Sequence, residues 1–191
     1  YYSTSDTGLG PTRSYLQGQA AGTSRLWTFP ISNFRQIATM DELEPHRLQE
    51  KDIRAFIEAL LDHVSQQGIV RLFYFHPPVS REYRGALQAL QSTAQRLSAE
   101  GRFRWYGMSE LADFQNRRMA VQWRTCGPPA HRQLVAAARD TLEGMTWLIP
   151  ASLPQTPQVT RGQARITQRN GFWQVEAGDV QVLHLSWAEA H

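Results

Sequence analysis

Apolar positions recur with a helical period in two segments of the chain. In the first segment, six apolar residues recur at i, i+3, i+4, i+7, i+8 and i+11 and share one helix face: Ile53, Phe56, Ile57, Leu60, Leu61 and Val64. Gly68 follows where a glycine commonly ends a helix. A second face consists of Tyr83, Leu87, Leu90, Ala94 and Leu97, and it stops before Gly101. The pattern predicts two amphipathic helices.

Short apolar runs around these helices are typical of strands. Such runs cover residues 24–30, 69–76 and 103–106, and Ser109 stands where it would cap a further helix over 110–118. Strand candidates and helix candidates therefore alternate along the chain. This alternation predicts parallel strands covered by helices, which is the α/β class.

The pattern changes at residue 119, where short strands replace the alternation. The strand candidates are residues 119–124, 133–138, 146–149, 162–167, 172–176 and 180–187. Asn170-Gly171 is a strong hairpin signal between two of them. The sequence predicts an α/β domain over residues 1–118 and a small antiparallel, β-sandwich-like module over residues 119–191.

Charge and composition exclude several classes of function. The net charge is +3, and the arginines are scattered among acidic residues rather than gathered in a basic stripe, so no nucleic-acid partner is expected. No apolar run approaches the roughly 18 residues of a membrane span. Cys126 is the single cysteine, which excludes an internal disulfide and a cysteine metal cluster.

The predicted strand over residues 69–76 ends on a titratable side chain. Tyr74 and His76 share one face of that strand, and functional groups of α/β folds collect at the carboxyl ends of strands. Pro77 follows and favours an extended backbone at His76. Two interpretations stay open from position alone: a functional histidine at the rim of a cleft, or a structural histidine bonded to a loop carbonyl.

The run FYFHPP, a helix and then FRWYGMSELADF resemble the C-terminal part of the polysaccharide deacetylase family of metal-dependent carbohydrate esterases. YYSTSDTG and LWTFPIS resemble the segment that precedes that motif. The resemblance covers about residues 1–118 and implies the C-terminal half of a (β/α) barrel. It implies that His76 is the general acid toward the leaving amine and that Asp6 is its partner. It also implies that Trp27 and Pro30 line the substrate pocket, beside Tyr74.

The family's metal-binding motifs do not occur in this chain. They are a Thr-Phe-Asp-Asp-like aspartate pair and a His-x3-His-like pair, and His46 and His63 have a different spacing. We therefore expect no metal site and no cofactor in this chain. A divalent metal, zinc or similar, is expected in a full-length parent that supplies the missing N-terminal half of the domain, a view that fits a chain beginning Tyr1-Tyr2.

The resemblance implies hydrolysis of the N-acyl amide of an amino-sugar polysaccharide, with the present chain inactive by itself. It also favours a periplasmic or cell-envelope location. The alternative is a non-catalytic carbohydrate-binding or interaction module that uses the β portion. Five tryptophans are candidates either for stacking on sugars or for the core: Trp105, Trp123, Trp147, Trp173 and Trp187.

Overall fold

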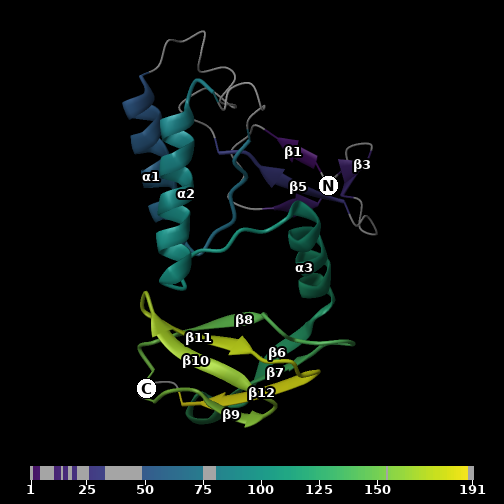
Figure 1. Ribbon diagram of the computed structural model, residues 1–191. Coiled ribbons are helices and arrows are strands. Elements are labelled where there is room, and N and C mark those ends of the chain that lie inside the picture. Colours follow the sequence, from purple (N-terminus) through teal and green to yellow (C-terminus); the bar gives the residue numbers. More distant parts are fainter. Residues whose placement is uncertain are drawn as a thin grey trace. The chain divides into compact units, whose positions relative to one another are not determined.

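The computed structural model describes residues 2–4, 11–13, 15–16, 19–20, 26–32, 49–74, 81–153 and 155–188. The chain divides into two compact units, Tyr1–Asp113 and Phe114–His191 (Figure 1). The first unit mixes helices with short strands, and the second consists mainly of antiparallel sheets. The protein thus has a general α/β architecture. The predicted boundary after residue 118 lies inside helix α3 (Met108–Ala120), and the two units divide a few residues earlier, between Asp113 and Phe114.

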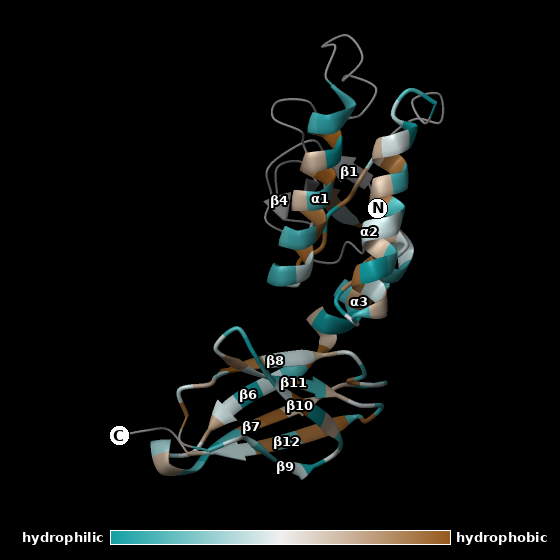
Figure 2. Ribbon diagram, turned by 60° about the vertical axis from the view of Figure 1, so that its left-hand side comes forward, coloured by the Kyte–Doolittle hydropathy of each residue, from teal (hydrophilic) through white to brown (hydrophobic). Residues whose placement is uncertain are grey.

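Two helices form the core of the first unit. They are α1 (Glu50–Gln67) and α2 (Arg84–Ala99), and both predicted apolar faces are confirmed. The shared core contains Ile53, Ile57, Leu61, Tyr83, Ala86, Leu90, Ala94 and Leu97. Figure 2 shows apolar and polar residues alternating along both helices. Gly68 closes α1 with a φ of +63°, the left-handed conformation that glycine adopts without a steric penalty.

A small mixed sheet accompanies these helices. Its central strand, β5 (Trp27–Pro30), pairs in parallel with β1 (Tyr2–Thr4) and antiparallel with β2 (Thr12–Arg13). A separate pair joins β3 (Tyr15–Leu16) to β4 (Gln19–Ala20). The strand pairings among the described residues do not close a barrel.

The predicted strand over residues 69–76 is wrong within its described part, residues 69–74. Only Leu72 pairs, through a parallel bridge to Ile31 in which the Leu72 N–H donates to the Pro30 carbonyl at 3.2 Å. Its apolar neighbours pack elsewhere: Val70 packs against the cluster of Trp27 and Phe29, and Phe73 against the core of the two helices. The apolar run therefore reflects burial against two clusters rather than a continuous strand ladder.

The predicted strand over residues 103–106 is also absent, since these residues form no strand. Phe103 packs against the core of α1 and α2, and its ring meets the ring of Trp105 edge to face at 5.0 Å between centroids. The Arg104 guanidinium lies over the Tyr106 ring. Aromatic contacts, rather than ladder hydrogen bonds, account for this aromatic run.

Helix α3 (Met108–Ala120) is longer than the sequence predicts. Ser109 lies inside the helix rather than at its cap, and the strand expected from Met119 begins only after Ala120. Ala112 belongs to the cluster of Trp27 and Phe29 in the first unit, whereas Phe114 packs against the core of the second.

The second unit contains two antiparallel sheets. The first has the order β6 (Gln122–Cys126), β7 (Arg132–Ala137), β12 (Val182–Trp187), β9 (Gln158–Arg161). The second has the order β10 (Ala164–Arg169), β11 (Phe172–Ala177), β8 (Thr146–Pro150). A short 3-10 helix, η3 (Pro129–His131), precedes β7. The hairpin signal is confirmed, because Asn170 and Gly171 both have positive φ and join β10 to β11.

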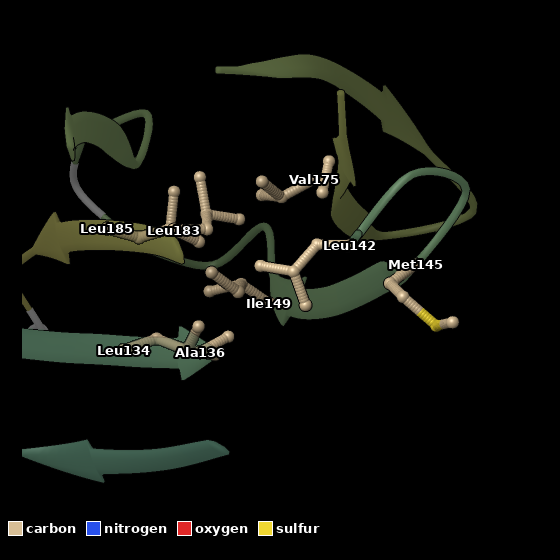
Figure 3. Packing of buried hydrophobic residues seen from close by; sticks show 9 residues of the cluster. Leu134, Ala136, Leu142, Met145, Ile149, Val175, Leu183 and Leu185 are labelled. Carbon is tan, nitrogen blue, oxygen red and sulfur yellow. The ribbon is translucent and has the colours of Figure 1, made fainter. Parts of the chain in front are cut away.

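Side chains from both sheets fill one core in this unit. Figure 3 shows Leu134, Ala136, Leu183 and Leu185 of one sheet gathered with Ile149 and Val175 of the other. Leu142 and Met145 come from the connection that precedes β8. The alternation of inward and outward residues follows the strand period of two.

A carboxylate of α1 caps the first turn of α2. Glu50 Oε1 accepts a hydrogen bond from the Ala86 N–H at 3.0 Å. A Cβ added at Gly85 would lie 2.5 Å from that same oxygen, so the glycine makes room for the carboxylate. Gly85→Ala therefore gains helix propensity but displaces the cap.

Gly85→Ala changes the free energy of unfolding in both backgrounds. We expect this change to favour the folded state by about 1 kcal/mol more in a Glu50→Ala background than in the wild type. A double-mutant cycle of urea unfolding measures this coupling between the two positions. Equal changes in the free energy of unfolding in both backgrounds would contradict the proposed cap.

Candidate functional site

A pocket of about 560 Å³ lies within the second unit. Strand β6 contributes Trp123 and Thr125, and β12 contributes Trp187. All residues of β8, Thr146–Pro150, line it as well. In the described sheets β6 pairs only with β7 and β8 only with β11, so the pocket is built on two edge strands.

Strand register explains why the three tryptophans face this pocket. Trp123 lies opposite the buried Ala136, and Trp147 lies opposite the buried Val175. Residues directly opposite each other share a face of the sheet, so both indoles lie on the core side. Trp187 follows the buried Leu185 by two positions and therefore shares its face.

The edge position of β6 leaves one of these core-facing side chains accessible. Trp123 is 59% exposed although its register neighbour Ala136 is fully buried. Trp147 and Trp187 are half-buried and pack against the core cluster. One indole is thus accessible, while two others are held by packing on regular strands. Sites on strands are positioned more precisely than sites on loops.

The chemistry of the pocket is aromatic, apolar and weakly polar. Leu134, Ile149 and Leu153 add aliphatic surface, and hydroxyl groups come from Thr125, Thr146 and Ser152. Among the described residues that line the pocket, none carries an ionisable side chain. Ligand pockets commonly measure about 300–1,000 Å³ and combine apolar walls with a few polar groups, and this one fits that description.

The two groups with shifted pKa values, Glu100 and Arg165, do not line this pocket. Hydrogen bonds from Arg102 and Arg96 lower the pKa of the Glu100 carboxyl, which follows α2 in the first unit. The bond to Glu176 raises the pKa of the Arg165 guanidinium. These groups are exposed ion pairs on the surface, and neither carboxylate is positioned as an acid or base in the pocket.

The candidate residues of the first unit are only partly described. Trp27 and Pro30 are buried in β5, and the Arg13 guanidinium lies 5.5 Å from the centre of the Trp27 indole. Tyr74 is 38% exposed and follows the segment that bridges to β5. His76 and Asp6 lie outside the described residues, so their roles remain predictions.

The described residues contain no group of three or more histidine, cysteine, aspartate or glutamate side chains arranged to hold a metal ion. No described helix is long and apolar enough to cross a membrane.

The sequence identifies the three pocket tryptophans as candidates for stacking on sugars, but it does not identify Thr125, Thr146 and Ser152 as lining residues. Hydroxyl residues at these positions carry no pattern that distinguishes them from other surface residues.

Comparisons with family models, with curated proteins and with solved structures found no match to this chain in any of the three.

Proposed function

We propose that this protein binds a carbohydrate through its second unit, a β-sandwich-like module that holds a saccharide in the tryptophan-lined pocket. One observation carries the proposal: Trp123, Trp147 and Trp187, from three separate strands, line one pocket of about 560 Å³. The exposed indole is available as a platform, and the two half-buried indoles form walls.

The physical basis is the match between an indole and a sugar ring. The face of an indole carries partial negative charge and attracts the partially positive C–H groups on the face of a pyranose. The hydroxyls of Thr125, Thr146 and Ser152 can donate to and accept from the sugar hydroxyls. A pocket with aromatic faces and neutral polar groups suits a ligand that is apolar on its faces and polar at its rim.

Isothermal titration of the full chain with neutral β-1,4-linked tetrasaccharides tests this function. We expect saturable binding with one site and a dissociation constant between about 1 μM and 1 mM, which corresponds to about −8 to −4 kcal/mol. A polyethylene glycol of similar size serves as the non-sugar control. Absence of binding to every saccharide, or equal heats from the control, would contradict the proposal.

A second candidate function concerns the first unit, which we propose is the C-terminal half of the (β/α) barrel of a polysaccharide deacetylase. The motif resemblance supports it, and so does Leu72, which precedes the FYFHPP segment in the sequence and forms a parallel bridge to Ile31, next to β5. In this proposal His76 protonates the leaving amine, Asp6 orients the imidazole, and Trp27, Pro30 and Tyr74 contact the amino-sugar polysaccharide.

Under this proposal the divalent metal, zinc or similar, is held by an N-terminal half outside this chain, and the protein acts in the periplasm or cell envelope. The coding sequence upstream of Tyr1 tests it directly. A Thr-Phe-Asp-Asp-like motif and a His-x3-His-like pair in that upstream sequence would support the enzyme. An upstream sequence without either motif would leave carbohydrate binding as the function.

A further inference from the structure

We propose that the tryptophan-lined pocket selects an uncharged, N-acylated amino sugar over the same sugar with a free, cationic amine. This inference rests on the proposed carbohydrate function and adds the chemical class of the ligand. It is carried by the charge and the apolar surface around Trp123, Trp147 and Trp187.

The described residues lining the pocket carry no carboxylate that could pair with an ammonium group. One carboxylate lies beside the lining, because Glu176 is opposite Thr146 in register. That carboxylate already accepts from Arg165, at 3.2 Å between Nε and Oε2. An ammonium group entering the pocket would lose its hydration without gaining an ionic partner.

Positive charge lies beside the pocket. Arg132 lies directly opposite Trp187 in the ladder of β7 and β12, so both side chains lie on the same face. Residues 114–191 contain eight arginines against five acidic residues, and this unit therefore carries the whole net charge of +3. Like charge disfavours a cationic ligand here.

The pocket also offers an apolar surface suited to an acyl methyl group. Leu148, which is 59% exposed, and Leu153 contribute aliphatic surface to the lining beside the indoles. An acetamido group placed there buries its methyl, while its amide remains able to bond a hydroxyl such as that of Thr125. An ammonium group gains one competing attraction, the cation–π contact with an indole face. We expect the lost hydration and the nearby Arg132 guanidinium to outweigh that contact.

Three tetrasaccharides with the same β-1,4 backbone test the inference, because they differ only in the C2 substituent: acetamido, hydroxyl or ammonium. Titration of the full chain at pH 6 is expected to give the tightest binding for the acetamido form and the weakest for the ammonium form. The two dissociation constants should differ by about 10-fold or more. No binding by any of the three would contradict the carbohydrate function itself. Ammonium binding as tight as acetamido binding would overturn only the present inference.

A charged substitution in the pocket lining distinguishes an electrostatic cause of the selectivity from a steric one. Ser152 is an exposed lining residue, so Ser152→Asp adds a carboxylate at the pocket without disturbing the core. The variant is expected to lower the ratio of the ammonium to the acetamido dissociation constant by at least about 3-fold, because the new carboxylate favours the ammonium form. Ser152→Asn is the uncharged control of the same shape, and its ratio should match the wild type. An unchanged ratio in Ser152→Asp would overturn the electrostatic account.

Discussion

Replacing Leu183 with alanine is expected to lower the free energy of unfolding of the second unit by about 2–5 kcal/mol. Leu183 is fully buried in the middle of the core that both sheets share (Figure 3). Its strand, β12, has neighbours on both sides in its sheet, so the backbone around the new cavity has little freedom to collapse. The loss combines the transfer free energy of the removed atoms with the cost of the cavity.

Urea unfolding followed by the NMR amide signals of β7 and β12 measures this change within the second unit. Leu148→Ala is the matched control, because Leu148 is 59% exposed in the same unit. We expect the control to change the free energy of unfolding by about 0.5 kcal/mol or less. A Leu183 variant as stable as the Leu148 variant would show that the two sheets do not share the core described above.

Replacing Trp123 with alanine is expected to weaken saccharide binding by about 10- to 100-fold while leaving the fold intact. Trp123 is 59% exposed in the free protein, so its indole contributes little to the core and remains available to a ligand. Stacking on a sugar would cover that indole, and the alanine variant loses both the covered area and the attraction of the ring face. Titration with the acetamido tetrasaccharide measures the loss.

The matched control is Trp105→Ala in the first unit. Trp105 is 57% exposed, nearly the same as Trp123, but it does not line the pocket. The control should bind the saccharide with wild-type affinity. Equal weakening by both variants would indicate a general effect of losing an exposed indole. Wild-type affinity in Trp123→Ala would remove this pocket from the binding site.

Local periodicity was sufficient to predict the helices. Residues such as Ile53, Ile57 and Leu61 recur at the helix period because one face is buried, and Gly68 supplies the left-handed residue that ends α1. The Asn170-Gly171 turn was predictable for a similar reason, since a two-residue hairpin needs positive φ at both positions. These signals are contained within a few neighbouring residues.

The errors arise where apolar residues are buried without forming a ladder. Val70 and Phe73 pack against two different clusters, and a run of apolar residues cannot distinguish this arrangement from a strand. The opposite error occurs at β9 (Gln158–Arg161), which was not predicted as a strand. Its burial pattern is largely exposed, so its sequence lacks the apolar signal although its backbone pairs with β12.

The pocket could not be predicted from local sequence, because it depends on the order in which distant strands pair in the two sheets. The sequence identifies Trp123, Trp147 and Trp187 as candidates either for the core or for stacking. For Trp123 and Trp147, which of the two applies depends on whether β6 and β8 are edge strands, and this follows from the order of strands far apart in the chain. Trp187 lies at the end of β12, an internal strand of its sheet. The alternation that places an indole on the core side also exposes it when its strand lies at an edge.

The most direct test of carbohydrate binding is an NMR titration that follows the indole N–H signals of the full chain with the acetamido tetrasaccharide. The indole signals of Trp123, Trp147 and Trp187 are expected to shift together and to saturate at one ligand per chain. Those of Trp27, which is buried in the first unit, and of Trp105, which lies outside the pocket, should stay in place. Static signals for all three pocket tryptophans at saturating saccharide, or shifts confined to Trp27 and Trp105, would contradict the account.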